Sequence, residues 1–191
     1  MKLYEKLPDS VIVNGKRIRL NLDFRNVLRM IDILSEDNLM QDARDYLALK
    51  CICKHPKKGM MGPVRKLLFP GAGSENGDKI TDFAQDADLI RAAFLQEYGI
   101  NLFRDKLHWF EFACLFACIP AGNKYSEILQ IRTKPIPAAT KWNQEERAWL
   151  MKAKAEFAVK LTEKEQERQY KKNVKGIGQM LAAIAGKGEK K

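Results

Sequence analysis

Cysteine and histidine side chains near residue 50 are the first candidates for chemistry, because they could hold a metal ion. Cys51 and Cys53 are separated by one residue, and His55 follows at the same interval. A four-ligand site would also need Cys114 or Cys118. Structural zinc sites usually leave two to four residues between paired cysteines. Because the spacing here is tighter, we favour cysteines that pack as small apolar side chains on helices over a zinc site.

Cys114 and Cys118 lie four residues apart in an apolar run, so a helix would place both thiols on one face. We expect both thiols to be buried in the core. Residues 1–6 lack the apolar stretch of a signal peptide, which predicts a cytosolic protein with reduced thiols.

Two glycines before a lysine suggest a phosphate-binding loop. Gly71 and Gly73 precede Lys79, but a P-loop has Ser or Thr directly after its lysine and follows a strand. Ile80 follows Lys79 here, and we predict no strand before it. The sequence therefore predicts no nucleotide site.

His108 is the remaining candidate for catalysis, with Asp82, Asp86 and Glu97 as possible partners. His108 stands at the start of an apolar helix, where capping or structural roles are commoner than that of a general base. Asp82 and Asp86 suit the positive end of a helix dipole. We therefore expect a protein that is not an enzyme and that needs no cofactor and no metal.

Tryptophans among cations near the C-terminus could bind nucleic acid. Aromatic rings stack on bases while Lys and Arg meet phosphates. The same segment holds carboxylates spaced like the ion pairs of a helix surface. We favour a solvated helix over a specific nucleic-acid site, and keep nucleic-acid binding as the rival interpretation. The residues concerned are Trp142 and Trp149, with Lys141, Arg147, Lys152 and Lys154.

The composition predicts a globular domain followed by a basic extension. Hydrophobic residues make up 46% of the 191 residues, and no run approaches the roughly 18 apolar residues of a membrane span. The formal net charge is +10, of which residues 141–191 carry +6, from 13 Lys and Arg against 7 Asp and Glu. A basic balance alone does not choose among nucleic acid, an acidic protein and a membrane surface.

The N-terminal third predicts a β-hairpin followed by helices. Strands over 10–13 and 16–20 flank Asn14-Gly15, which suits a type I′ turn. Apolar residues at helical spacing predict a helix over 24–34, with Asp23 as its N-cap. A second helix is expected over about 40–53, and a short third helix after Pro63.

The middle of the chain predicts a glycine-rich loop over 70–77 and then three helices. Asp82 with Gln85 resembles a capping box, and Gly99 suits the C-terminal end of that helix. Residues 107–119 hardly contain a charge, so we expect a central helix buried nearly all round. A short helix is predicted over 125–131.

The C-terminal third predicts a linker over 134–142 and a long helix over 143–171, capped by Asn143 with Glu146. Trp149, Ala153, Phe157 and Leu161 mark one stripe of that helix. We thus divide the chain into a helical domain with an N-terminal hairpin (1–133), the linker, and a basic helix with an amphipathic tail (143–191).

The amphipathic tail combines helical spacing with poor helix formers. Gly176 and Gly178 interrupt its apolar residues, and each costs about 1 kcal/mol of helix propensity. We predict a helix that forms only when docked, against the alternative of an idle tail. The candidate partner-binding residues are Trp149, Phe157, Val174, Ile177, Leu181 and Ile184.

Several blocks of the first 133 residues resemble the bacteriophage gene-fifteen-product family, over about two-thirds of the chain. Phe110 departs from the pattern, since a second tryptophan is expected there, and the segment from Trp142 onward is less similar. The blocks are Leu7-Pro8, the hairpin of Val11 to Gly15, Asp23-Phe24-Arg25, Asp82 to Phe94, Tyr98 to Ile100, Leu107-His108-Trp109, Tyr125 to Ile128, and Arg132-Thr133.

The resemblance implies a tail-assembly chaperone of long-tailed phages, made in the host cytoplasm. Such a protein holds the tape-measure protein while tail-tube subunits polymerise around it. The implied partner is the tape-measure protein, with the major tail protein as a second candidate. From the residues we expect no specific nucleic acid and no membrane, and self-association stays open. The alternatives are a basic nucleic-acid-associated phage protein and a structural tail component.

Overall fold

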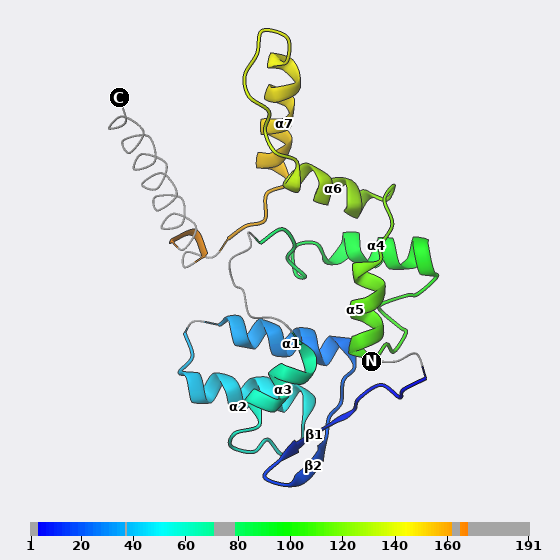
Figure 1. The fold of residues 1–191 in the computed structure, drawn as a ribbon, viewed down its shortest axis with the longest axis vertical. Helices are drawn as coiled ribbons and strands as arrows, with labels where there is room; N and C mark the ends of the chain where they lie inside the picture. The colour runs from blue at the N-terminus through cyan, green and yellow to red at the C-terminus, as the bar shows by residue number, and fades with distance from the viewer. Residues whose placement is uncertain (1–3, 37, 71–78, 162–164, 168–191) are drawn as a thin grey trace, which may run out of the picture. The chain divides into compact units, whose positions relative to one another are not determined.

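The computed structural model describes residues 4–36, 38–70, 79–161 and 165–167. These residues are mainly α-helical with an N-terminal antiparallel hairpin (Figure 1), which confirms the expected fold class. They form two compact units. One unit holds the described residues within 1–75 and 83–127, and the other holds those within 76–82 and 128–191. The boundary between the units falls inside α6 (Lys124–Thr133).

The hairpin consists of β1 (Ser10–Val13) and β2 (Lys16–Arg19), with Val11 opposite Ile18. Asn14 and Gly15 have φ values of 49° and 73°, so both central residues of the turn are left-handed, as predicted. Val11 and Val13 are buried, and β1 packs against α3 (Met61–Leu68). The hairpin thus gains the support that two strands need.

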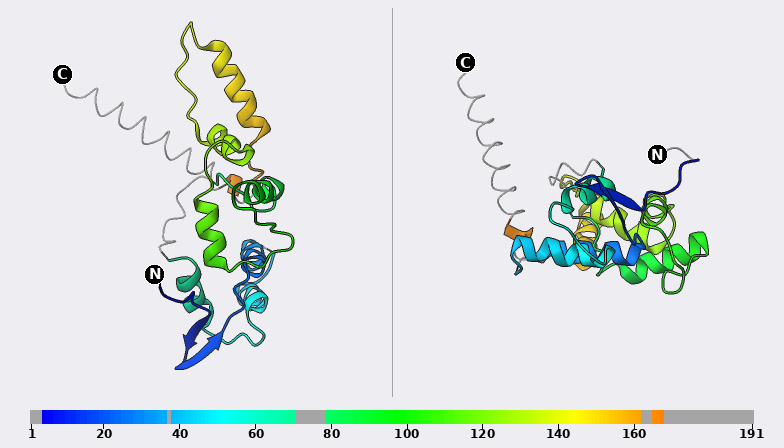
Figure 2. Two further views of the ribbon diagram at one scale, coloured as in Figure 1. Left: turned by 90° about the vertical axis from the view of Figure 1, so that its right-hand side faces the viewer. Right: turned by 90° about the horizontal axis from the view of Figure 1, so that it is seen from below.

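Helices α1 (Phe24–Ser35) and α2 (Gln41–Ile52) lie side by side (Figures 1 and 2). The predicted N-cap of α1 is confirmed, because the Asp23 side chain accepts from the Arg25 N–H at 3.0 Å. Val27 and Met30 of α1 and Ile52 of α2 are almost fully buried. Of the apolar stripe predicted for α1, Phe24 and Val27 are buried and Leu28, Ile31 and Leu34 are half-buried, so the stripe faces the core in part.

Helix α4 (Ala87–Tyr98) begins later than predicted. Residues 83–86 form turns, and Asp86 rather than Asp82 occupies the N-cap position of α4, while Asp82 pairs with the Lys79 ammonium group at 2.9 Å. The end of α4 is as predicted. Gly99 has a φ of 66° and closes the helix in the left-handed conformation that glycine adopts without strain.

His108 is the N-cap of helix α5 (Trp109–Ala117), which confirms the predicted capping role of that residue. The expected burial all round is wrong. Trp109 and Phe112 are buried, whereas Cys114 and Cys118, expected in the core, are exposed. An apolar helix is buried all round only if other helices pack on every side of it. In the described structure, one face of α5 is covered.

Helix α7 (Gln144–Glu156) is shorter than the helix predicted over 143–171, because residues 157–161 are not helical. The Arg132 Nε atom donates to the Phe157 carbonyl at 2.6 Å, so this carbonyl has a partner outside the helix. Asn143 occupies the N-cap position without capping. Its side chain bonds instead to the Thr140 N–H and the Ala138 carbonyl, and so holds the linker.

The residues of α7 that are buried also differ from the apolar stripe predicted for this helix. Leu150 is fully buried and Ala153 is buried, while Trp149 is 58% exposed. Arg147 donates to the Pro137 carbonyl, and Lys134 pairs with Glu146. The linker residues of the second unit are therefore bonded to α7 rather than free of it.

Candidate protein-binding groove

A cluster of aromatic rings forms the centre of the first unit, and Phe112 lies at its middle with 1% of its surface exposed. Its ring is stacked on those of Phe24 at 4.7 Å and Phe94 at 5.2 Å between centroids. It also contacts three further rings, at 5.9–6.2 Å. These belong to Phe83, Trp109 and Phe116. One side chain from α5 thus joins α1, α4 and the segment before α4.

The starts of α1 and α5 are bonded to each other, although they are far apart in the sequence. The Phe24 N–H donates to the Leu107 carbonyl at 3.0 Å, and the Trp109 N–H donates to the Leu22 carbonyl at 2.8 Å. Asp23 and His108 face each other across this short bridge, and each caps its own helix. The bridge sets the position of the aromatic rings that follow on both helices.

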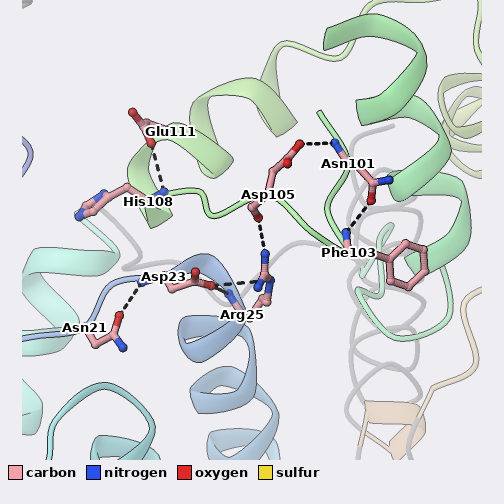
Figure 3. Close-up of polar contacts among 8 residues, drawn as sticks. All are labelled: Asn21, Asp23, Arg25, Asn101, Phe103, Asp105, His108 and Glu111. Carbon is pink, nitrogen blue, oxygen red and sulfur yellow. Dashed lines mark hydrogen bonds and ion pairs between the residues drawn. The ribbon is translucent and has the colours of Figure 1, made fainter. Parts of the chain in front are cut away.

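His108 takes part in a reciprocal cap (Figure 3). Its Nδ1 atom accepts from the Phe110 N–H at 3.3 Å, while Glu111 accepts from the His108 N–H at 3.1 Å. Both ends of the capping box are thereby satisfied. Because the Nδ1 atom of His108 already accepts a hydrogen bond from the first turn of α5, we favour the structural role predicted for this residue.

A tight turn between α4 and α5 carries an exposed aromatic side chain. The Asn101 N–H donates to the Asp105 carboxylate at 2.7 Å, and the Phe103 N–H donates to the Asn101 side chain at 3.0 Å (Figure 3). Arg25 donates to the Asp105 carbonyl and so ties this turn to α1. Phe103 is 70% exposed on a turn that these bonds hold in place.

Between α1, α4 and this turn lies a groove of about 310 Å³. The apolar ring of Phe112 is part of its lining, and Phe103 stands at its rim. Among the lining residues, three are arginines and one is an aspartate. The lining consists of Phe24, Arg25, Leu28, Arg29, Asp32, Phe83, Ala87, Ile90, Arg91, Leu102, Phe103 and Phe112.

The arginines of the groove are arranged differently from one another. Arg91 lies over the Phe103 ring, 4.4 Å from its centroid, and bonds to Asp88 at 2.8 Å. Arg25 lies 3.9 Å from the Asp23 carboxylate. Arg29, one turn after Arg25 on α1, is exposed to solvent. With Asp32 in the lining and Asp23 and Asp88 beside it, each of the three arginines is matched by an aspartate in or next to the groove.

Tyr98 joins the end of α4 to α5 behind the cluster. Its hydroxyl donates to the Leu115 carbonyl at 2.8 Å, and its ring meets the edge of Phe94. Burial raises the pKa of this phenol, so it keeps its proton and continues to donate. The aromatic cluster is therefore held by hydrogen bonds on two sides, at the start of α1 and α5 and at the end of α4.

The cysteine and histidine pattern forms no metal centre in the described ranges, where no group of three or more potential ligands comes together. Cys53 is buried and Cys51 is half-buried, and burial raises the pKa of the Cys51 thiol. Gly71 and Gly73, which suggested a phosphate loop, lie outside the described residues.

The tryptophans suggested for nucleic acid are exposed, Trp142 at 95% and Trp149 at 58%. Two of the four cations near them have other partners. Arg147 bonds to the Pro137 carbonyl, and Lys154 donates to the Arg132 carbonyl at 2.6 Å. These two side chains hold the second unit together.

Trp149 is accessible and Phe157 is half-buried at the end of α7, and their predicted contact with a partner stays a prediction. The other predicted partner-binding residues lie outside the described residues; they are Val174, Ile177, Leu181 and Ile184. The groove was not foreseen. Arg25 and Arg29 one turn apart beside an apolar stripe, and an aromatic residue in a turn, were its signals in the sequence.

These features define a mainly α-helical protein with a groove lined by aromatic side chains and arginines, of which Phe103 is the exposed aromatic residue. A protein-family model described as "Bacteriophage Gp15 protein" matches residues 3–70 and 54–159, which together span most of the chain. The chain therefore belongs to this bacteriophage family, as its blocks indicated. No curated protein and no solved structure matches the chain.

Within the described part of the chain, none of the helices combines the length and the apolar character that crossing a lipid bilayer requires.

Proposed function

We propose that this phage protein is a tail-assembly chaperone that binds the tape-measure protein in the host cytoplasm. It holds this client while tail-tube subunits polymerise. The role requires binding and release, and needs no catalytic residue, cofactor or metal. The major tail protein is the second partner in this proposal.

The groove of the first unit is the observation that carries the proposal. A tape-measure protein is expected to be long, helical and apolar in places, so its chaperone needs a surface that receives one face of a helix. Leu28 of α1 is half-buried and offers apolar surface in the groove, whereas Phe112 and Ile90 line it from the core with 1% and 3% of their surface exposed. Phe103, held outward on its turn, adds apolar surface that a bound segment would cover.

Co-expression tests the proposal directly. The tape-measure protein of the same phage is produced with and without the tagged full chain, and its soluble fraction and co-purification are measured. We expect the client to be recovered in the soluble fraction with the chain. A client that stays insoluble and fails to co-purify contradicts the proposal.

Phe103→Ala tests whether the groove is the surface used. Loss of an exposed aromatic anchor should reduce co-purification about tenfold or more, since such residues carry much of the binding energy. Tyr46→Ala is the matched control, because Tyr46 is also an exposed aromatic residue with a cation, Lys50, over its ring. Equal recovery with both variants would place the client elsewhere.

Two measurements separate the rival roles. A structural tail component would be found in purified particles by mass spectrometry, whereas a chaperone is absent from them. A nucleic-acid-associated protein would keep binding DNA near physiological ionic strength. We expect DNA binding only at low salt, as incidental basic charge produces.

A further inference from the structure

We propose that the first unit has a second docking surface, which binds an acidic segment of a protein partner with an apolar residue among its carboxylates. This surface, the cationic end, consists of the hairpin and the segment between α2 and α3, with Ile12 exposed on the hairpin. None of its residues lines the groove, so the inference goes beyond the proposed function and does not depend on the client of the groove. Its cations are Lys16, Arg17, Arg19, Lys54, Lys57 and Lys58.

The outward face of the hairpin carries an isoleucine beside arginines. Val11 and Val13 are buried, and because successive side chains of a strand alternate, Ile12 lies on the opposite face. Arg17 is directly opposite Ile12 in the register of the two strands, and Arg19 is two residues further along on the same face. Ile12 is 65% exposed and both arginines are exposed, so the described residues leave this face open.

The segment between α2 and α3 brings lysines beside the hairpin (Figures 1 and 2). The Asn21 N–H, just after β2, donates to the Ile52 carbonyl at the end of α2 at 2.8 Å. Further along, the fully buried Met60 donates its N–H to the Lys57 carbonyl at 3.2 Å. Lys57 and Lys58 are exposed on a turn that is anchored in the core at its base.

Carboxylates are scarce at the cationic end. Residues 10–22 contain three Lys and Arg and residues 46–74 contain six, and neither range contains Asp or Glu. Within the described ranges, Arg19 alone among the six cations has an ion-pair partner, Asp9 at 3.3 Å. The side chains of this pair are largely exposed, so the pair is weak. The cationic end therefore has unmatched positive charge, which an acidic partner complements.

Ile12 distinguishes a protein from other polyanions. The phosphates of a duplex would meet the cations but offer charged oxygens, and little apolar surface, to an isoleucine. An anionic bilayer would receive Ile12, yet even a myristoyl chain gives only marginal anchoring, and this side chain is much smaller. A second copy of the chain carries a net charge of +10 and is repelled. An acidic protein segment supplies carboxylates for the cations and an apolar side chain for Ile12.

Two labelled peptides test the inference on the full chain. Both are rich in glutamate, and they differ in having leucine or serine at the centre. Fluorescence anisotropy gives the Kd of each near physiological ionic strength, where a Debye length of about 8 Å screens charges that are not in contact. We expect the leucine peptide to bind about threefold or more tightly, because its leucine buries apolar surface against Ile12. Ile12→Ser should remove this difference.

Charge reversal on the protein locates the surface. Arg17→Glu on β2 and Lys57→Glu on the turn should each weaken both peptides about fivefold or more, because attraction becomes repulsion. Lys152→Glu on α7 is the control, since it changes the net charge of the chain by the same amount at an exposed lysine of the second unit. Circular dichroism confirms that all three variants are folded.

Several results would overturn the inference. Neither peptide binds, or serine binds as well as leucine; or the three charge reversals have equal effects, so that only net charge matters; or duplex DNA or phosphatidylserine vesicles of equal charge displace the leucine peptide as well as unlabelled peptide does. Self-association that Lys57→Glu abolishes would assign the surface to a second copy instead. If the tape-measure protein still co-purifies in any of these cases, the proposed function stands and the cationic end alone is wrong.

Discussion

Replacing Phe112 by alanine should be among the most destabilising changes in the first unit. The side chain is 1% exposed and meets five other aromatic rings. A buried Phe→Ala change typically costs about 3–5 kcal/mol, as lost transfer free energy plus a cavity. Aromatic pairs add about 0.5–1.5 kcal/mol each beyond burial. We therefore expect about 4–5 kcal/mol, a large part of the roughly 5–15 kcal/mol that keeps a domain folded.

The measurement should report on the first unit alone. Trp109 lies 5.9 Å from Phe112, whereas Trp142 and Trp149 belong to the second unit and are exposed. In a background with both exposed tryptophans changed to phenylalanine, urea unfolding followed by fluorescence gives the free energy of unfolding from Trp109. The slope against urea should stay the same, because the folded surface is unchanged.

Two further variants calibrate this result. Phe112→Leu keeps most of the buried volume and should cost about 1–2 kcal/mol, while Phe103→Ala removes an exposed ring and should cost less than about 1 kcal/mol. A loss for Phe112→Ala no greater than that for Phe103→Ala would refute the view that this cluster holds the groove together.

Three other predictions follow from single contacts. His108→Ala should lower the free energy of unfolding by about 0.5–2 kcal/mol, and His108→Asn should recover most of it, since asparagine also caps helices. Arg132→Ala should speed hydrogen exchange at the end of α7 in mass spectrometry and leave α1 unchanged, because Arg132 holds the Phe157 carbonyl. In the native protein, exposed Cys114 should react with a thiol reagent before the buried Cys53. Labelling of Cys51 should rise with pH into a range above the ordinary one for a thiol, because burial raises its pKa and the thiolate is the reactive form. Mass spectrometry of labelled peptides tests that order, and rapid labelling of Cys53 in the folded protein would contradict it.

Local signals in the sequence were sufficient where a residue's own backbone chemistry sets the structure. Asn14-Gly15 predicts the left-handed turn because few other residue pairs accept positive φ at both positions. Asp23 and Gly99 mark helix ends for similar local reasons, an acceptor side chain and an achiral backbone. The apolar stripe of α1 likewise predicts part of the face that is buried.

Helix boundaries were predicted less well than turns. Asp82 had the pattern of a cap, but α4 starts at Ala87 with Asp86 at its N-cap position. The helix expected to continue past Glu156 stops where Arg132, 25 residues away, takes the Phe157 carbonyl. A local sequence pattern indicates which hydrogen-bond partners a polar group could have. Which of them it bonds to depends on the residues that folding places beside it.

The groove depended wholly on the tertiary structure. The sequence determined that Phe112 is apolar and that Arg25 and Arg29 share a helix face, and it led to no prediction for Phe103. It did not determine that backbone bonds between residues 22–24 and 107–109 would bring these groups around one space. Pairing between segments that are far apart in the chain depends on the whole packing, because many such pairings satisfy the same local preferences and only one of them also closes the aromatic core.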